Sequence, residues 1–246
     1  MTDFFALYDA LLPEIPQEPI LCVSSGDSWT GVETADALGL AMTTAGDTAP
    51  RVLPRWEEAA TLAELAPAVK SWNFAEASAA MAAINAFYNT QDRMETLDAA
   101  EPFAHYCTRG LDLRGKTIGV VGHLNMPESI RREAGAFFIL ERNPQPGDYP
   151  DSACDALLPQ CDVVILTAST LVNKTLPHLL ELCVNAYTIL TGPTCPMCPA
   201  LLEFGIDRLS GLVITNREAM RRRIRENLPG PPYPFGQPFL LTKEGL

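Results

Sequence analysis

Residues 117–122, Thr-Ile-Gly-Val-Val-Gly, decide the fold class of this chain. A short apolar run rich in β-branched residues ends there in glycine, which is the pattern of a buried strand followed by a tight turn. About nineteen residues later a second apolar run, 137–140, ends in the acid Glu141. Together these features outline a Rossmann-type ligand site, although Gly119 and Gly122 lack the third glycine of the dinucleotide fingerprint. The stretch therefore indicates the fold and leaves the cofactor open.

From about residue 115 onward, the sequence repeats strand, loop and helix. Apolar runs of this length without alternation suit strands that are covered on both faces, as in a parallel sheet. The predicted strands are 117–121, 136–141, 162–167, 186–191 and 211–214, and the predicted helices are 127–134, 174–185 and 198–204.

The first half reads as a small α+β unit that precedes this sheet. We expect a short helix over 3–12 and alanine-rich helices over 61–71 and 74–89. Strands at 20–23 and 37–42, linked by the polar segment 24–31, should form a meander or a hairpin pair. The fold class is thus α/β, a Rossmann-like parallel sheet preceded by a smaller α+β domain, with domains at 1–108 and 109–246. The Pro-rich tail from Pro229 to Pro238 is expected to lack regular structure.

Composition argues against several kinds of partner. The chain of 246 residues is 47% hydrophobic, which is enough for a sizeable core, and its formal net charge is −12. So acidic a chain is a poor match for nucleic-acid phosphates and anionic membranes, and we expect neither as a partner. A local run of arginines at 221–225 is either a solvated face near a helix end or a clamp for a phosphate or carboxylate.

Sequence features also suggest a cellular location. No apolar run approaches the ~18–20 residues that span a bilayer, and no signal peptide is evident. The seven cysteines are an odd number, scattered through apolar runs of a chain too large to need disulfide staples. This pattern indicates reduced thiols, so we predict a cytoplasmic protein and leave homo-oligomerisation open.

Polar side chains follow two of the predicted strands at their carboxyl ends. Thr167 ends the strand 162–167, and Asn173 and Thr175 come shortly after it. Each could cap the next helix, but one cap does not explain a group of five polar side chains, so we expect the group to contact a ligand. The five are Thr167, Ser169, Thr170, Asn173 and Thr175. The next strand end carries a Gly-Pro-Thr turn at 192–194 before a helix start, where backbone N–H groups can hold an anion.

Three more residues could contribute to a site. His123 directly follows the glycine turn and should project toward the crevice, where it could transfer a proton, ligate a metal or donate a hydrogen bond. Glu141 could accept hydrogen bonds from a ribose-like diol, or it could be a solvated strand end. Asn85 interrupts the apolar face of the helix 74–89, so it either pairs within the core or lines a cleft between the two halves.

The pair Cys195-x-x-Cys198 has three interpretations. It could consist of incidental thiols in a Pro-rich turn, of a redox pair with a depressed thiol pKa, or of half a metal site. Because the chain has no second Cys-x-x-Cys, a structural zinc site would need Cys107, Cys154 or His123 as further ligands. We retain Cys195 and Cys198 as candidate ligands of a transition metal.

Several motifs occur in an order that resembles one protein family. They are Ile118-Gly-Val-Val-Gly122-His123, Leu140-Glu141-x-x-Pro144-x-x-Gly147-Asp148, Asp162-Val-Val-Ile-Leu-Thr167, Leu171-Val-Asn173-Lys-Thr175-Leu and Gly192-Pro193-Thr194-x-Pro196, with Ala83-Ile84-Asn85-Ala86 upstream. Over most of the chain this set resembles the putative heavy-metal chelation family of prokaryotic proteins. The resemblance implies an enolase-N-terminal-like domain followed by a Rossmann-like domain, partial likeness to Rossmann methyltransferases, and a site between the domains.

The resemblance also implies a function and a set of site residues. The family's suggested roles are heavy-metal chelation, or making or breaking pterin-, flavin- or siderophore-like molecules. The family usually has a small hydroxyl residue where Cys195 stands, so the Cys-x-x-Cys pair is not expected to be its metal device. Transferred by position, the site comprises Asn85, Gly122, His123, Glu141, Thr167, Asn173, Thr175, Gly192, Pro193 and Thr194.

These observations leave three functional hypotheses. The first is an interdomain site that binds or processes a metal-chelating small molecule, with His123 and Asn173 as its candidate catalytic residues, and it leaves open whether the protein is an enzyme. The second is a protein that binds metal directly through Cys195, Cys198 and His123. The third is a methyltransferase or related Rossmann enzyme with S-adenosylmethionine or a nucleotide as its cofactor.

Overall fold

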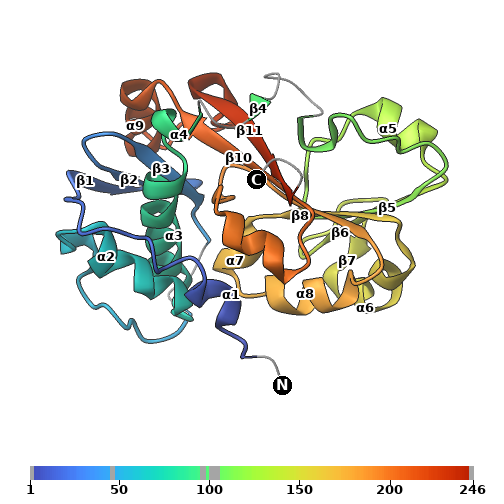
Figure 1. Ribbon diagram of the computed structural model, residues 1–246, viewed down its shortest axis with the longest axis horizontal. Helices are drawn as coiled ribbons and strands as arrows, with labels where there is room; N and C mark the ends of the chain where they lie inside the picture. Colours follow the sequence, from blue (N-terminus) through green and yellow to red (C-terminus); the bar gives the residue numbers. More distant parts are fainter. Residues whose placement is uncertain (1–2, 45–47, 95–97, 100–105, 244–246) are drawn as a thin grey trace.

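The computed structural model describes residues 3–44, 48–94, 98–99 and 106–243, and it has the predicted α/β fold class. Within these residues there are two sheets, a three-stranded one of order β1-β2-β3 and an eight-stranded one of order β4-β11-β10-β9-β8-β5-β6-β7. The small sheet and helix α3 lie side by side at one end of the molecule, and the large sheet extends away from them (Figure 1).

The first half is an antiparallel meander covered by a helix. Helix α3 packs against β2 and β3, and Asn73 caps it by accepting the N–H of Glu76. The helix lies so close that a Cβ at Gly39 would stand 2.1 Å from Ala82 O, so β3 needs a glycine there. The elements are α1 (Ala6–Asp9), β1 (Cys22–Ser25), β2 (Trp29–Glu33), β3 (Leu38–Met42), α2 (Leu62–Leu65), α3 (Phe74–Tyr88) and α4 (Gln91–Met94), with 3₁₀ turns at Trp56–Glu58 and Ala66–Lys70.

The second half is the predicted Rossmann-like sheet. Strands β6, β5, β8, β9 and β10 pair in parallel, and β11 returns antiparallel to β10 and to the short β4. The strands are β4 (Asp98–Ala99), β5 (Thr117–Val121), β6 (Ala136–Glu141), β7 (Tyr149–Pro150), β8 (Val163–Thr167), β9 (Tyr187–Thr191), β10 (Arg208–Ile214) and β11 (Gly236–Thr242). The helices are α5 (Glu128–Glu133), α6 (Cys154–Leu157), α7 (Ser169–Val172), α8 (Leu176–Leu182) and α9 (Arg217–Arg225), with 3₁₀ turns at Tyr106–Thr108, Asp151–Ala153, Leu158–Gln160, Pro199–Phe204 and Tyr233–Phe235.

Both faces of the parallel strands are buried, which explains their unbroken apolar runs. Ile118 and Val120 of β5 pack on one face beside Ile130 of α5. On the other face, Val164 and Leu166 of β8 join the cluster that includes residues of α6, α7 and α8. A strand covered on both sides shows no apolar–polar alternation, so composition alone was enough to predict it.

The first half has the meander that was one of its two expected arrangements, but the middle strand was missed. The segment 24–31 is not only a loop, because β2 begins at Trp29, and all five residues of β2 are buried between α3 and α9. The tail is not irregular throughout, because β11 begins at Gly236. Pro238 is tolerated in this strand because β4 pairs only with Phe239 and Leu240, so the backbone at Pro238 has a described partner on one side only.

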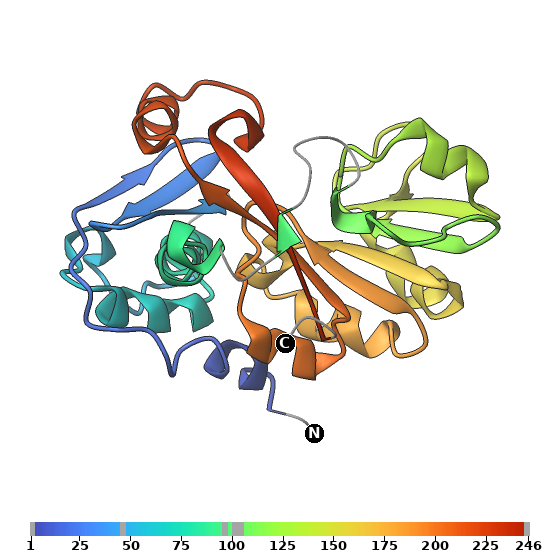
Figure 2. The same cartoon turned by 45° about the horizontal axis from the view of Figure 1, so that its top comes forward.

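The two halves share a hydrophobic core. Trp29 and Leu40 of the small sheet pack with Leu212 of β10 and with Met220 and Ile224 of α9. Figure 2 shows α9, from the C-terminal part of the chain, lying over β1 and β2. The C-terminal part therefore completes the small sheet instead of standing apart from it.

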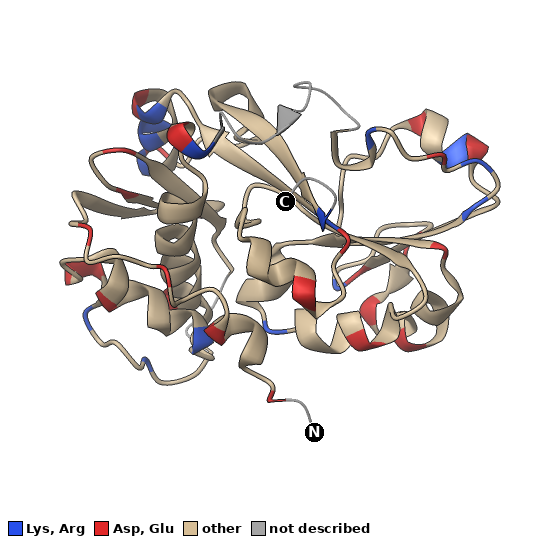
Figure 3. Ribbon diagram, viewed as in Figure 1, with Lys and Arg blue, Asp and Glu red and all other residues tan. Residues whose placement is uncertain are grey.

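The arginine run lies on this packed helix. Arg222, Arg223 and Arg225 occupy the last turn of α9, where cations suit the helix dipole. Arg221 Nε lies 3.4 Å from Glu33 Oε2, and Arg222 pairs with Glu226 at 2.9 Å. Basic and acidic segments accordingly alternate on and beside α9 in Figure 3. In the described part of the chain, no helix combines the length and apolar character needed to cross a bilayer.

Candidate functional site

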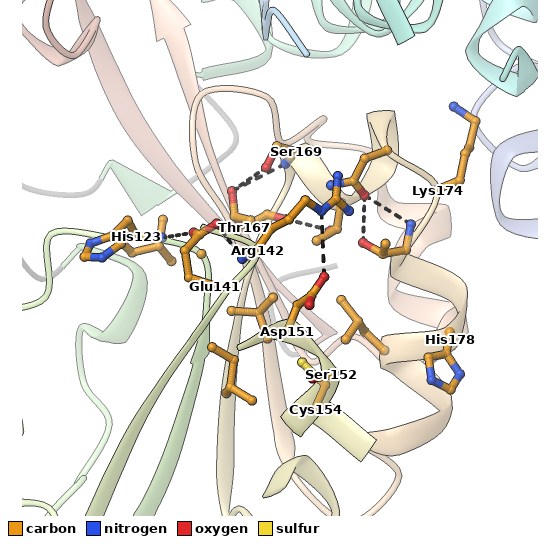
Figure 4. Close-up of a pocket in the computed structure, with 18 of the residues that line it drawn as sticks. His123, Glu141, Arg142, Asp151, Ser152, Cys154, Thr167, Ser169, Lys174 and His178 are labelled. Carbon is orange, nitrogen blue, oxygen red and sulfur yellow. Dashed lines mark hydrogen bonds and ion pairs between the residues drawn. The ribbon is translucent and has the colours of Figure 1, made fainter. Parts of the chain in front are cut away.

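A cavity of about 680 Å³ opens at the carboxyl ends of β5, β6 and β8. Strand β5 has β6 on one side and β8 on the other, so the chain changes direction between β5 and β8. This switch point is where open α/β sheets bind ligands. The cavity is lined by six of the twelve sequence-predicted site residues, namely Gly122, His123, Glu141, Thr167, Asn173 and Thr175 (Figure 4).

The glycine turn after β5 shapes one wall of the cavity. Gly122 has φ +100°, a conformation that L side chains rarely adopt, and its N–H donates to Leu140 O at 2.9 Å. A Cβ on Gly122 would lie 2.8 Å from Thr167 Cγ2, so glycine is also required for β5 and β8 to approach closely at their ends.

Glu141 ties the ends of β5 and β6 together. Its Oε2 accepts the backbone N–H of His123 at 2.9 Å, and its Oε1 accepts the N–H of Arg142 at 2.8 Å. Because backbone donors already occupy both carboxylate oxygens, this residue positions the turn that carries His123. A ribose diol would have to compete with these bonds.

His123 forms a pair that the sequence analysis did not anticipate. Its Nε2 lies 2.7 Å from Asp148 Oδ2, and the Asp148 side chain is only 7% exposed. The same oxygen accepts the N–H of Gln145 at 2.9 Å, and this bond is the main cause that lowers the pKa of Asp148. The imidazole is 40% exposed and points away from the Arg142–Asp151 pair in Figure 4.

Asn173 and Thr175 bind each other and do not cap the next helix. Asn173 Oδ1 accepts the Thr175 hydroxyl at 2.7 Å and the Thr175 N–H at 3.2 Å. Thr175 stands at the N-cap of α8, but its side chain makes no capping bond. Since the carbonyl oxygen of Asn173 is engaged, its amide N–H groups, which bond to none of the described residues, are the donors it can offer to a ligand.

Lys174 was missed, although it lies between two predicted site residues. It lines the cavity, is 4% exposed and has φ +66°, which is unusual for a residue other than glycine. Its Nζ donates to Val172 O at 2.8 Å and lies 5.3 Å from the centre of the Tyr8 ring. Burial lowers the pKa of its amine to about 7. Nothing in an Asn-Lys-Thr sequence signals that the lysine is buried.

The rest of the cavity combines apolar walls with a charged rim. Val121, Leu140 and Leu179 line it. Among the described residues of the first half, Met42 alone lines it. Arg142 Nε lies 3.8 Å from Asp151 Oδ2, and both side chains are about half exposed. A ligand with an apolar body and a polar edge fits such a surface.

The segment 192–198 lies outside this cavity and locks the two halves together. Asn85 is fully buried, and its Nδ2 donates to Leu40 O at 2.6 Å and to Thr194 O at 3.0 Å. Thr194 Oγ1 in turn accepts the N–H of Met42 at 2.9 Å. Asn85 was expected either to pair within the core or to line a cleft between the halves, and in the structure it pairs within the core. Gly192, Pro193, Thr194 and Asn85 do not line the cavity.

Cys195 and Cys198 are also buried away from the cavity, at 0% and 1% exposure. Burial raises the pKa of the Cys195 thiol to about 12 and also raises that of Cys198. A redox pair would need a depressed pKa instead. Among the described residues, no three or more His, Cys, Asp or Glu side chains form a group that could hold a metal ion.

The whole fold has relatives among solved structures. A protein of unknown function from the DUF364 family of Desulfitobacterium hafniense is 32% identical, with a TM-score of 0.85 over 98% of both chains. A DUF364 family protein of unknown function from Pyrococcus horikoshii is 22% identical, with a TM-score of 0.77 over 98% of this chain and 100% of that chain. The latter similarity shows the fold alone.

Sequence comparison gives the family. Residues 110–233 match the DUF364 family and residues 8–88 match the DUF4213 family, both described as putative heavy-metal chelation. The chain belongs to this heavy-metal chelation family, as its motifs suggested. The uncharacterized protein MJ0500 of Methanocaldococcus jannaschii is 32% identical over 106 residues, which are 40% of this chain and 41% of that protein. The matched region thus spans about two fifths of the curated relative's length.

Proposed function

We propose that this protein binds, or binds and processes, a small organic metal chelator in the cavity at the carboxyl ends of β5, β6 and β8. The observation that carries the proposal is the cavity itself, in which three neighbouring strand ends bring polar groups together above apolar walls. Its volume of about 680 Å³ suits a compound of cofactor size.

The family description adds the metal to this proposal. The described residues form no group of three or more metal-ligating side chains. In this proposal the metal therefore enters the cavity already coordinated by an organic chelator. Flavins, pterins and catecholate siderophores each combine flat aromatic rings with carbonyl or hydroxyl oxygens. The apolar walls would contact the rings, and the amide of Asn173 would donate to an oxygen at the polar edge.

Asn173→Asp is the sharpest test of this site. The aspartate keeps an oxygen that accepts from Thr175 and loses the two N–H donors aimed at a ligand. Calorimetric titration with flavin mononucleotide, a pterin and an iron(III) catecholate complex should show at least one of them binding to the wild type. Asn173→Asp should lower that affinity at least ~10-fold, which corresponds to about 1.4 kcal/mol.

Asn143→Asp is the matched control, because Asn143 is exposed, undergoes the same chemical change and does not line the cavity. It should leave the affinity unchanged. If no probe binds, or if Asn173→Asp and His123→Ala both bind as tightly as the wild type, the proposed site is wrong. Titration with S-adenosylmethionine and NAD under the same conditions addresses the Rossmann-cofactor hypothesis.

A further inference from the structure

We infer that His123 contributes its Nδ1 atom as a single protein ligand to the metal of the bound chelate, with Asp148 as the residue that positions the ring. This inference rests on the proposed function and names the atom through which the protein would meet the metal. It starts from the short contact between His123, which lines the cavity, and Asp148, which is not among the lining residues.

The contact determines which ring nitrogen is available. An ionised carboxylate only accepts hydrogen bonds, so at 2.7 Å from Asp148 the proton of the neutral ring is on Nε2. Nδ1 then carries the lone pair, and it has no hydrogen-bond partner among the described residues. An imidazole held by a carboxylate on one nitrogen, with the other free, is the usual arrangement of a metal-ligating histidine.

The turn around His123 is held on both sides. Glu141 accepts the backbone N–H of His123, while Asp148 holds the side chain and is itself anchored by the N–H of Gln145. These bonds fix the orientation of the ring before a ligand arrives. Such preorganisation makes one weak ligand more effective, because little rotamer entropy is lost on binding.

The other histidine of the cavity differs from His123. His178 has Nε2 3.1 Å from Asp155 Oδ1 and Nδ1 3.8 Å from Glu181 Oε2, so a carboxylate faces each of its ring nitrogens. Its ring is also held less firmly, because its partner Asp155 is 64% exposed, whereas the Asp148 side chain that holds His123 is 7% exposed. His178 is a matched control for His123, since both histidines line the same cavity.

A single nitrogen ligand also restricts the class of cargo. One protein ligand is too few to hold a bare ion, which needs three or four. It is sufficient for a metal whose organic chelator leaves one coordination position open. Imidazole suits zinc, copper, iron and nickel, so the predicted cargo is an incompletely coordinated chelate of such a metal.

The test uses copper(II) nitrilotriacetate, a chelate with open coordination positions, and tag-free protein. Electron paramagnetic resonance should show that the wild type adds one imidazole nitrogen to the copper, and His123→Ala should lose this coupling. Asp148→Asn should retain the coupling, alter the copper hyperfine splitting and weaken binding ~10–100-fold. His178→Ala and His105→Ala, the latter outside the described residues, should match the wild type.

The outcomes separate this inference from the proposed function. Chelate binding that is weakened by Asn173→Asp but shows no imidazole coupling would overturn the role of His123 and leave the cavity as the binding site. Coupling that persists in His123→Ala, or that disappears in His178→Ala, would also overturn it. Absence of copper chelate binding would overturn the inference, while titration with the organic probes would still decide the proposed function.

Discussion

Lys174 illustrates how one residue at the site opposes stability. Its ammonium group is buried against the Tyr8 ring with Val172 O as its hydrogen-bond acceptor, and its side chain points away from the Arg142–Asp151 pair (Figure 4). Burial without a carboxylate disfavours the charged form and lowers the pKa from 10.5 to about 7. Its positive φ adds backbone strain.

This lysine makes stability depend on pH. Between about pH 7 and 10.5 the unfolded chain keeps the lysine proton and the folded protein does not, so the lysine's penalty decreases as the pH rises. Its contribution to the free energy of unfolding should change by up to about 1.4 kcal/mol per pH unit. Lys174→Met should therefore be more stable than the wild type at pH 7, and this advantage should shrink by pH 9.

Urea unfolding at pH 7, 8 and 9 measures this difference, and comparing the two proteins cancels the titration of other groups. The half-exposed Lys116 provides the control variant Lys116→Met, which should show no comparable slope. A difference between Lys174→Met and the wild type that is constant with pH would show that the lysine is not held neutral.

At the residue scale, the sequence predicted where several site residues lie better than it predicted which contacts they make. Gly122, His123, Thr167 and Asn173 meet in one cavity because parallel strands end on the same edge of a sheet. The partner of His123 could not be predicted, because Asp148 reaches it from the loop after β6. The locations of such loop residues depend on turn geometry that apolar periodicity does not encode.

At the scale of elements, α3 connects the two sheets. Asn85 in α3 and Asn89 at its C-cap are one turn apart, and both bind the segment 194–197 of the second half. Asn89 Nδ2 donates to Cys195 O and to Leu212 O, and its Oδ1 accepts the N–H of Met197 at 2.9 Å. These bonds satisfy backbone groups that would otherwise be buried without partners.

Asn89→Ala should therefore be strongly destabilising. Removing the amide leaves two carbonyls and one N–H buried without this partner, at a cost of about 2–4 kcal/mol. Urea unfolding monitored by circular dichroism measures the loss. Asn143→Ala is the control on an exposed residue and should change stability by less than ~0.5 kcal/mol. Equal stability of the two variants would show that α3 does not lock the halves through this residue.

The same contacts explain which elements the sequence could predict. The buried parallel strands β5, β6, β8 and β9 were found because composition marks them, whereas β2 was hidden in a segment of mixed composition. The turn 192–194 resembled an anion site, but Asn85 of α3 donates to Thr194 O at its end, and Asn89 donates to Cys195 O directly after it. Sequence patterns do not reveal which helix of the other half packs against a given turn, because this contact depends on tertiary packing.

At the scale of the whole molecule, the halves are not independent. Helix α9 and strand β10 contribute Met220, Ile224 and Leu212 to a core with the small sheet, and β4 pairs with β11 at the edge of the large sheet. Because each unit includes elements from the other half of the chain, separating the halves would expose apolar surface on both. We therefore expect that a division near residue 108 would not yield two independently stable units.

Unfolding should consequently be a single transition. All three tryptophans, Trp29, Trp56 and Trp72, lie in the first half, so fluorescence reports on that half, while amide exchange of β8 reports on the second. Ile130 of α5 packs against Ile118 and Val120 of β5, so Ile130→Ala should lower the free energy of unfolding by about 2–4 kcal/mol. In a urea titration, tryptophan fluorescence and the amide protection of β8 should then be lost at the same, lower urea concentration. If the tryptophan midpoint stayed at the wild-type value while β8 lost protection, the halves would be separate folding units. The shared core of α9 and the small sheet would then contribute little to cooperativity.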